Sequence, residues 1–406
     1  MTRPQEQPLG SWRSRNVIAL GVISLLTDVA SDAAIPLLPA FILTLGGGAM
    51  VIGWIEGVAE AVSSVLKLLF GRWSDRIGKS RPFVISGYAL SSVAKPLLAL
   101  ALAPWHVLAV RITDRVGKGL RTSPRDALIA ASVRPEERGA AFGLHKSMDH
   151  AGAVIGPLCA AALLLWVTDD LRIVFWLTAI PGLLVIVAAL VGVREVPRPA
   201  VQDKASGPAD HGLARFLVPL GLFTLAKASE VFLILKLMGE SVGESLQLAA
   251  FPLVWVGLHV VKMACSVPGG KIADRWGKRR VIAFGWLLFA CTFACLAFAQ
   301  ERWVIAVLLG LYAVYGGLTE AAEKALVADI VPRNKQGAAF GWYHLTLGLL
   351  ALAASALFGT LWQLVSAQVA FLTSAGFAVA ALAMLFILGM PQKPGEVMKT
   401  QEGGLL

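Results

Sequence analysis

The chain has 406 residues, of which 57% are hydrophobic and 15% are charged, and its formal net charge at pH 7 is +10. Soluble domains contain about 45–50% apolar and about 25% charged residues, so this composition excludes a disordered chain, a secreted disulfide scaffold and a nucleic-acid-binding domain. The four cysteines lie in apolar stretches without zinc-binding spacing. A chain this apolar is expected to fold within lipid.

Apolar segments long enough to cross a bilayer recur along the whole chain. A spanning helix needs about 20 mostly apolar residues. Glycine, proline and charge clusters divide the sequence into twelve such segments, near 17–45, 51–70, 83–103, 105–122, 138–167, 171–193, 214–238, 246–268, 281–299, 303–326, 337–365 and 367–390. We therefore predict an all-α membrane protein with twelve transmembrane helices.

Lysine and arginine are concentrated in alternate connections between these segments. The two tails and the connections 72–81, 121–138, 194–215, 271–280 and 333–335 contain 24 of the 36 basic residues. The intervening connections contain only Arg172 and Arg302. Positively charged loops remain in the cytoplasm. This predicts a protein integral to the cytoplasmic (inner) membrane of a bacterium, with both termini cytoplasmic and anionic membrane lipid against its basic loops.

The two halves of the chain contain an internal repeat. Residues 71–81 match 270–280 at six of eleven positions, and 126–143 match 324–341 at nine of eighteen, including a shared Gly-Ala-Ala-Phe-Gly. Six spans in each half, an even number, give the repeats a parallel orientation around a central cavity. The predicted units are an N-terminal half (1–193), a cytoplasmic linker (194–212) and a C-terminal half (213–406).

The repeated loop Gly-x-x-x-Asp-Arg-x-Gly-Lys resembles the loop between helices 2 and 3 in the major facilitator superfamily. In that family the loop is associated with holding the cytoplasmic side closed while the protein faces outward. The alternative is a basic loop that only sets topology. The resemblance implies a first latch loop containing Gly71, Asp75, Arg76, Gly78, Lys79 and Arg81. The second latch loop contains Gly270, Asp274, Arg275, Gly277 and Lys278.

The segment 138–167 carries a second resemblance. Its spacing is similar to the antiporter motif of drug–proton exchangers in the same superfamily, although that pattern ends in Gly-Gly and this chain has Ala-Ala at 160–161. Small residues also serve ordinary close helix packing. The resemblance favours the bacterial drug–proton antiporter-like branch, and therefore export. The matching residues are Gly143, Gly152, Gly156 and Pro157.

The segment 105–122 and the loop after it resemble the superfamily in two further ways. The family places an arginine on its fourth helix, and both Arg111 and Arg115 fit that position. The stretch 117–127, Gly-Lys-Gly-Leu-Arg-Thr-Ser-Pro-Arg-Asp-Ala, resembles a bacterial subgroup.

Three predicted spans carry ionisable residues four positions apart, so each pair shares a helix face. A rise of about 1.5 Å per residue puts these groups at comparable depths. A buried carboxylate near a movable arginine can bind and release a proton. The alternative is a static ion-pair network that braces the helices. The predicted proton-coupling residues are Asp28, Asp32, Glu56, Glu60, Arg111 and Arg115.

Other charged residues within the spans are candidates for lining a substrate cavity. His145 and Asp149 share one face of the segment 138–167, but two or three ligands without a further partner do not predict a metal site. Lys227 and Glu230 are spaced so that they could instead pair with one another. The predicted cavity residues are Lys146, Asp149, His150, Lys227 and Glu230.

These features predict a secondary active transporter that works by alternating access. No phosphate-binding loop or nucleophile–base arrangement is recognisable, so we expect no enzyme, no metal and no cofactor. The expected partners are protons and a small-molecule substrate, and the protein is expected to be a monomer. Proton-coupled export is the leading hypothesis, and proton-coupled import of a small organic anion is the alternative. Substrate identity does not follow from the sequence.

Overall fold

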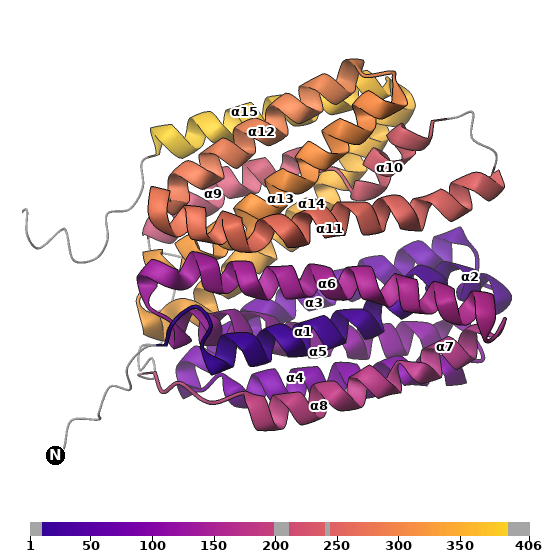
Figure 1. The fold of residues 1–406 in the computed structure, drawn as a ribbon, viewed down its shortest axis with the longest axis horizontal. Coiled ribbons are helices and arrows are strands. Elements are labelled where there is room, and N and C mark those ends of the chain that lie inside the picture. The colour runs from indigo at the N-terminus through magenta and orange to yellow at the C-terminus, as the bar shows by residue number, and fades with distance from the viewer. Residues whose placement is uncertain (1–9, 199–210, 240–243, 389–406) are drawn as a thin grey trace, which may run out of the picture.

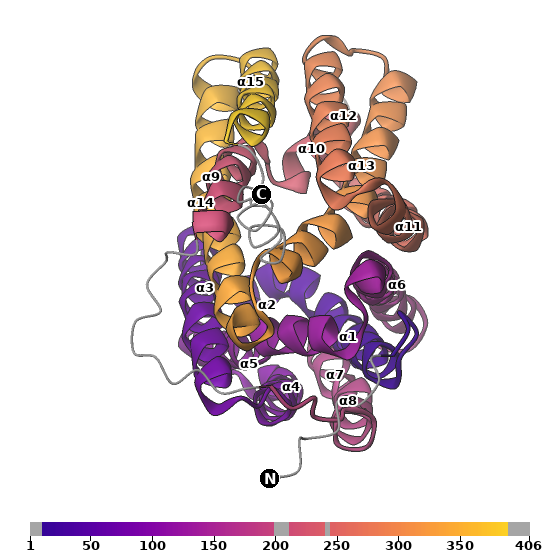
Figure 2. The same cartoon turned by 90° about the vertical axis from the view of Figure 1, so that its left-hand side faces the viewer.

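The computed structural model describes residues 10–198, 211–239 and 244–388, and within these ranges it contains fifteen α-helices and four short 3-10 helices. The predicted all-α fold is confirmed. The helices run roughly parallel to one another, and α1–α8 lie on one side of the molecule with α9–α15 on the other (Figure 1 and Figure 2).

The helices of the first half follow the predicted segments in order. They are α1 (Arg15–Ala34), η1 (Ile35–Leu37), α2 (Leu38–Thr44), α3 (Ala49–Ile77), α4 (Arg81–Ala94), η2 (Lys95–Leu100), α5 (Pro104–Ser132), η3 (Pro135–Glu137), α6 (Arg138–Trp166), α7 (Leu171–Leu177) and α8 (Ala179–Gly192).

The helices of the second half also follow the predicted segments in order, with one clear break. Its helices are α9 (His211–Ala226), α10 (Glu230–Met238), α11 (Glu244–Trp276), α12 (Lys278–Phe298), α13 (Arg302–Ile330), η4 (Arg333–Lys335), α14 (Gln336–Leu364) and α15 (Ala367–Ile387). The predicted span 214–238 is interrupted at residues 227–229, between α9 and α10.

Ten segments within the described ranges are long and apolar enough to cross a membrane. The predicted spans 51–70 and 105–122 correspond to α3 and α5, which are absent from these ten although each helix has 29 residues. Both helices carry many charged residues, so their composition alone does not identify them as membrane-spanning.

The predicted ends of several segments are wrong because helices continue through charged sequence. We expected a connection at 121–138, but α5 continues to Ser132, and Arg121 and Arg125 are buried within it. Likewise, α3 continues to Ile77 and α11 to Trp276. Charge marks the end of an apolar run but not the end of a helix, since charged side chains such as Arg121, Arg125 and Asp75 find partners inside the protein.

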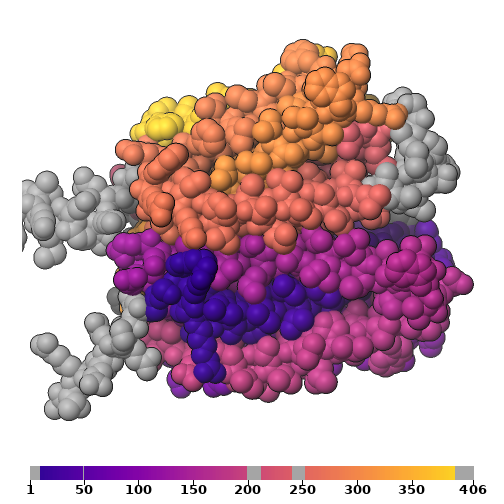
Figure 3. Space-filling model, in the orientation of Figure 1, coloured from indigo at the N-terminus to yellow at the C-terminus, as the bar shows by residue number. Residues whose placement is uncertain are grey.

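The most extensive contacts between the halves are those of α3 with α14 and of α6 with α11. The second pair is visible as adjacent bands on the face in Figure 3. Glycines allow close backbone contact at one end of each pair. A Cβ atom at Gly71 would lie 2.2 Å from the Gly337 carbonyl oxygen, and a Cβ at Gly139 would lie 2.4 Å from the Gly270 oxygen. The repeat therefore produces two equivalent crossings.

We expect Gly337→Ala to destabilise the protein by about 1–3 kcal/mol, because its new methyl group would lie 2.5 Å from the Gly71 oxygen and 2.6 Å from Asp75 Oδ1. Gly310→Ala is the matched control, since a Cβ there has no other atom within 4 Å. Thermal unfolding of the purified protein should show a lower Tm for Gly337→Ala only. Equal Tm values would contradict the close crossing.

Candidate functional site

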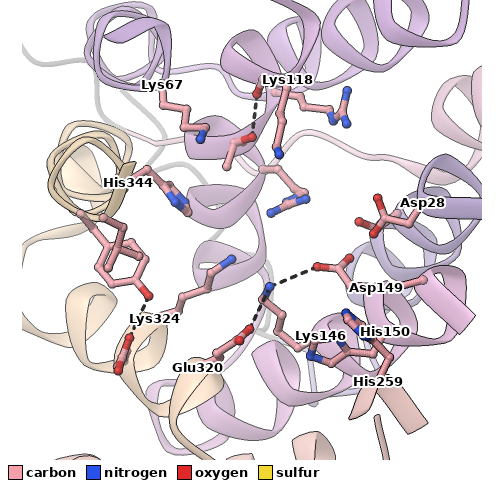
Figure 4. A pocket seen from close by; sticks show the side chains of 18 of the residues that line it. Asp28, Lys67, Lys118, Lys146, Asp149, His150, His259, Glu320, Lys324 and His344 are labelled. Carbon is pink, nitrogen blue, oxygen red and sulfur yellow. Dashed lines mark hydrogen bonds and ion pairs between the residues drawn. The ribbon is translucent and has the colours of Figure 1, made fainter. Parts of the chain in front are cut away.

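A cavity of about 500 Å³ lies between the two halves and is lined mainly by charged and polar side chains. The ammonium ends of Lys118 and Lys324 and the carboxylates of Asp28 and Asp149 point into the same open space (Figure 4). Helices α1, α3, α5 and α6 contribute from one half, and α11, α13, α14 and Lys227, in the break after α9, contribute from the other. This arrangement gives both halves access to one site.

The predicted proton-coupling residues separate into two groups. Asp28 and Asp32 line the cavity, and within the described part of the chain no lysine or arginine lies at ion-pair distance from either. Glu56, Glu60, Arg111 and Arg115 do not line it.

Those four residues instead form ion pairs between α3 and α5. Arg111 Nε donates to Glu56 Oε1 at 2.9 Å, and Arg111 Nη2 donates to Glu56 Oε2 at 2.5 Å. Arg115 Nη1 lies 3.6 Å from Glu60 Oε2. Asp114, which sequence reasoning passed over, is buried among Lys95 at 3.4 Å, Arg111 at 3.7 Å and Arg115 at 3.8 Å. Its position about one helical turn after Arg111 could have indicated that Asp114 pairs with that arginine.

Four of the five predicted cavity residues line the cavity: Lys146, Asp149, His150 and Lys227. Lys146 Nζ lies 3.5 Å from Asp149 Oδ2 and 3.0 Å from Glu320 Oε2 in the opposite half. The ring of His150 lies 5.3 Å from the ring of His259, also across the halves.

Glu230 does not line the cavity. It forms an ion pair with Lys262, and the Tyr312 hydroxyl donates to its Oε1 at 3.1 Å. The break between α9 and α10 removes the helical spacing on which pairing with Lys227 would depend. Lys227 lies over the rings of Phe223 and Tyr315 instead.

A buried carboxylate that sequence reasoning missed connects the halves beside the cavity. Asp126 on α5 contacts Arg125 at 3.0 Å, Lys324 on α13 at 2.8 Å and His344 on α14 at 2.9 Å. Asp126 and Lys324 occupy equivalent positions of the internal repeat, so the alignment was the signal that could have found this pair.

The aspartates of both latch loops cap helices of the opposite half. Gly337 N and Ala338 N donate to Asp75 at 3.0 and 2.7 Å, whereas Gly139 N and Ala140 N donate to Asp274 at 2.9 and 2.8 Å. The acceptors therefore satisfy N–H groups that a helix N-terminus leaves without intrahelical partners.

The other latch-loop residues have local roles. Gly78 and Gly277 adopt positive φ angles of 70° and 97°, a conformation that favours glycine. Lys278 lies 3.8 Å from Asp274 and 2.5 Å from Asp329. Arg81 N donates to Glu195 at 2.8 Å. The remaining basic residues of the two loops, Arg76, Lys79 and Arg275, are exposed.

The start of the predicted linker packs against the first latch loop. Arg198 Nη1 donates to Asp75 at 3.3 Å, and its Nη2 donates to Ser80 Oγ at 2.5 Å. Burial lowers the pKa of the Arg198 guanidinium, while the carboxylates of Asp75 and Glu195 oppose that shift. Residues 199–210 of the linker lie outside the described residues.

The antiporter-like motif on α6 contacts two helices. A Cβ at Gly143 would lie 2.4 Å from the Ser266 oxygen on α11. At Gly152 and Gly156 it would lie 2.6 and 2.8 Å from backbone oxygens of α1. Pro157 lies within α6. These glycines therefore allow close packing against α11 and α1.

We expect Arg111→Gln to lower the free energy of unfolding by about 1–3 kcal/mol, because Arg111 is buried and holds both Glu56 and Asp114. Asp32→Asn breaks no ion pair and should have little effect on Tm. Thermal unfolding of both variants tests the difference. A stable Arg111→Gln protein that has lost proton coupling would contradict a bracing role.

Comparison with known proteins identifies the family to which this helical fold belongs. The family model of the Major Facilitator Superfamily matches residues 20–257 and 213–404. The chain is 29% identical over 381 residues to an MFS-type transporter of Methanocaldococcus jannaschii, covering 92% of this chain and 95% of that protein. It is 26% identical over 322 residues to the multidrug resistance protein MdtH of Edwardsiella ictaluri, covering 76% and 77%.

Two solved structures share the fold. The human organic anion transporter MFSD10 (TETRAN) has a TM-score of 0.78 and 17% identity, covering 94% of this chain and 100% of that chain. A bacterial homologue of the iron transporter ferroportin, in its outward-facing state, has a TM-score of 0.72 and 16% identity, covering 92% and 99%. The chain belongs to the Major Facilitator Superfamily, and it is a membrane transporter of small molecules rather than an enzyme.

Proposed function

We propose that this protein is a proton-coupled secondary transporter that exports a small molecule by alternating access. The observation that carries the proposal is the position of Asp28 and Asp32 on the cavity wall, without a basic partner at ion-pair distance in the described ranges. Ionisable residues within the membrane-spanning helices of a transporter commonly form proton pathways. A proton and a substrate that compete for these carboxylates would be exchanged across the membrane.

In this proposal α3 and α5 also cross the membrane, which gives twelve transmembrane helices in two parallel six-helix repeats. Their charged residues Glu56, Glu60, Arg111 and Arg115 pair with each other, which reduces the cost of charge within the bilayer. The proposed halves are 1–193 and 213–406, joined by a linker at 194–212. In the proposed orientation the latch loops face the cytoplasm of a bacterium, next to anionic lipid, and both termini are cytoplasmic. A monomer encloses the cavity.

The proposed conformation is outward-facing. The inter-half contacts of Asp75, Asp274 and Asp126 lie on the latch side of the cavity. Toward the other end of α3, Met50 and Trp54 are 78% and 67% exposed. A Cβ at Gly53 or Gly57 would have no other atom within 4 Å. The latch loops would therefore close the cytoplasmic side while the opposite side is open.

Export is favoured by the name of the relative MdtH, a multidrug resistance protein, and by the antiporter-like motif on α6. A second candidate function is proton-coupled import of a small organic anion. It is favoured by Lys118, Arg121 and Lys227, which line the cavity and have no carboxylate at ion-pair distance among residues 10–198, 211–239 and 244–388.

We expect Asp28→Asn and Asp32→Asn to abolish proton movement coupled to substrate, because neither amide can titrate. The measurement uses purified protein in liposomes with an internal pH dye, an imposed pH gradient and a panel of cationic, neutral and anionic compounds. Asp169→Asn, an exposed residue between α6 and α7, is the control and should behave as wild type.

Opposed proton and substrate movements that disappear in the two variants would support exchange. Movement in the same direction would overturn export and support anion import. Unchanged proton coupling in both variants would contradict the role of Asp28 and Asp32.

We expect Asp75→Asn combined with Asp274→Asn to open the latch side, because each substitution removes a charged acceptor at a helix N-terminus. The readout is labelling of Leu347→Cys, a cavity position, by a membrane-impermeant maleimide in inside-out vesicles of a variant without native cysteines. Labelling should increase severalfold relative to the same protein carrying Asp169→Asn. No increase would contradict the latch.

A further inference from the structure

One helix presents a row of basic side chains to the cavity. Lys118, Arg121, Thr122 and Arg125 of α5 all line it. Their spacing of three or four residues puts them on one face of the helix. Lys118 lies near the middle of α5, and transporter substrate sites commonly lie near the bilayer midplane. These residues belong to the stretch 117–127, for which the proposed transport cycle has no role.

Two of these cations have no carboxylate partner in the described part of the chain. Arg125 is held by Asp126, but Lys118 and Arg121 have no acidic side chain at ion-pair distance. Neutral groups position Arg121: its Nη1 donates to Ser91 Oγ at 2.5 Å, and its guanidinium lies 4.4 Å from the Tyr88 ring centroid. A buried charge without a counter-ion is costly, so an anion that entered here would be stabilised.

The remaining lysines on the cavity wall are mostly neutralised. Lys67 pairs with Glu60 at 3.4 Å, Lys146 with Glu320 at 3.0 Å, and Lys324 with Asp126 at 2.8 Å. Lys227, from the other half, also lacks a carboxylate at ion-pair distance among the described residues but lies over the rings of Phe223 and Tyr315. In the half that contains α1, the unpaired positive charge on the cavity wall is on Lys118 and Arg121.

Carboxylates without a basic group at ion-pair distance among the described residues lie on another helix. Asp28 and Asp32 of α1 line the same cavity without a basic partner, as described above. In Figure 4 the carboxylate of Asp28 lies across open space from the ammonium group of Lys118. The cavity therefore offers separate acidic and basic surfaces.

The cavity wall is more polar than apolar. Among its described lining residues, only Ala153, Trp255 and Leu347 have apolar side chains. Pockets for drug-sized ligands are lined predominantly by hydrophobic and aromatic side chains. A lipophilic cation would leave the basic groups on α5 without a counter-ion, so it fits this cavity poorly.

We propose that the cavity binds a small amphoteric solute, with an acidic group between Lys118 and Arg121 and an amine facing Asp28 and Asp32. The inference rests on the proposed function, since it assigns the substrate class of the same cavity. It also supplies a reason for exchange: the amine of the solute and the proton would compete for Asp28 and Asp32, while the acidic group gives selectivity.

The test measures calorimetric binding to the purified full-length protein in detergent. Unbranched ω-amino acids, n-alkylamines and n-alkanoates of matched length are compared, with ω-aminoalkylphosphonates in parallel to distinguish a carboxylate from a phosphorus acid. We expect the better amphoteric series to bind at least about tenfold more tightly than either single-group series, because a charge-assisted hydrogen bond contributes about 1.5–3 kcal/mol.

Variants of the α5 residues locate the acidic group. Lys118→Gln and Arg121→Gln should each weaken the binding of the amphoteric probes about tenfold or more and leave alkylamine binding unchanged. Size-exclusion chromatography should show that both variants are folded. Lys118→Arg should retain most of the affinity. Lys236→Gln is the control, because Lys236 lies on α10 and does not line the cavity.

The inference and the proposed function fail in different ways. The inference would be overturned if alkylamines bound as tightly as the amphoteric probes, or if the amphoteric probes showed no saturable binding. In either case, proton-coupled movement of an amine would still support the transporter proposal. Saturable amphoteric binding lost in Lys118→Gln, without proton movement in liposomes, would support the inference and overturn proton coupling.

Discussion

The arrangement of the two halves depends on carboxylates that cap helices across the interface. Asp75 on α3 accepts hydrogen bonds from the N-terminus of α14, and Asp274 on α11 accepts them from the N-terminus of α6. Each cap combines a negative charge with the partial positive charge of a helix N-terminus. It also requires close backbone contact, which Gly71 against Gly337 provides at the first crossing. Since α3, α6, α11 and α14 also line the cavity, these contacts fix how the two halves meet at the latch-loop end of it.

Charged residues inside the molecule fall into two groups: those that pair with one another and join helices, and those that line the cavity without an ion-pair partner among the described residues. The pairs of Glu56 with Arg111 and Glu60 with Arg115 lie between neighbouring helices of one half, and these four residues do not line the cavity. Such pairs join helices in lipid, where little hydrophobic force acts between them. Charges that lack a protein partner, such as Asp28 and Lys118, line the cavity instead. A transporter can leave charges unpaired only where water, a proton or a substrate can reach them.

Much of the fold could be predicted from the sequence, because apolar runs and the repeat depend on local composition. The roles of individual charges could not. Arg121 and Arg125 were assigned to a connection because hydropathy falls at residue 121, yet α5 continues and buries both. Glu230 was assigned to the cavity, but its partner Lys262 lies on another helix. Contacts between residues distant in sequence decide such cases, and helical spacing says nothing about them.

The internal repeat explains why the capping contact of the latch loops occurs twice whereas the cavity is asymmetric. The latch aspartates and the Gly-Ala-Ala-Phe-Gly segments that they cap are conserved between the halves of this chain, so one contact is made twice. At the position next to the cavity, the repeat carries Asp126 in one half and Lys324 in the other, and these opposite charges pair at 2.8 Å. A symmetric pair of like charges would repel there. Because the two halves differ at this position, an attraction between Asp126 and Lys324 holds the halves together where like charges would repel. The halves also differ nearby: α5 presents Lys118 and Arg121 to the cavity, and α13 has no equivalent row of basic residues.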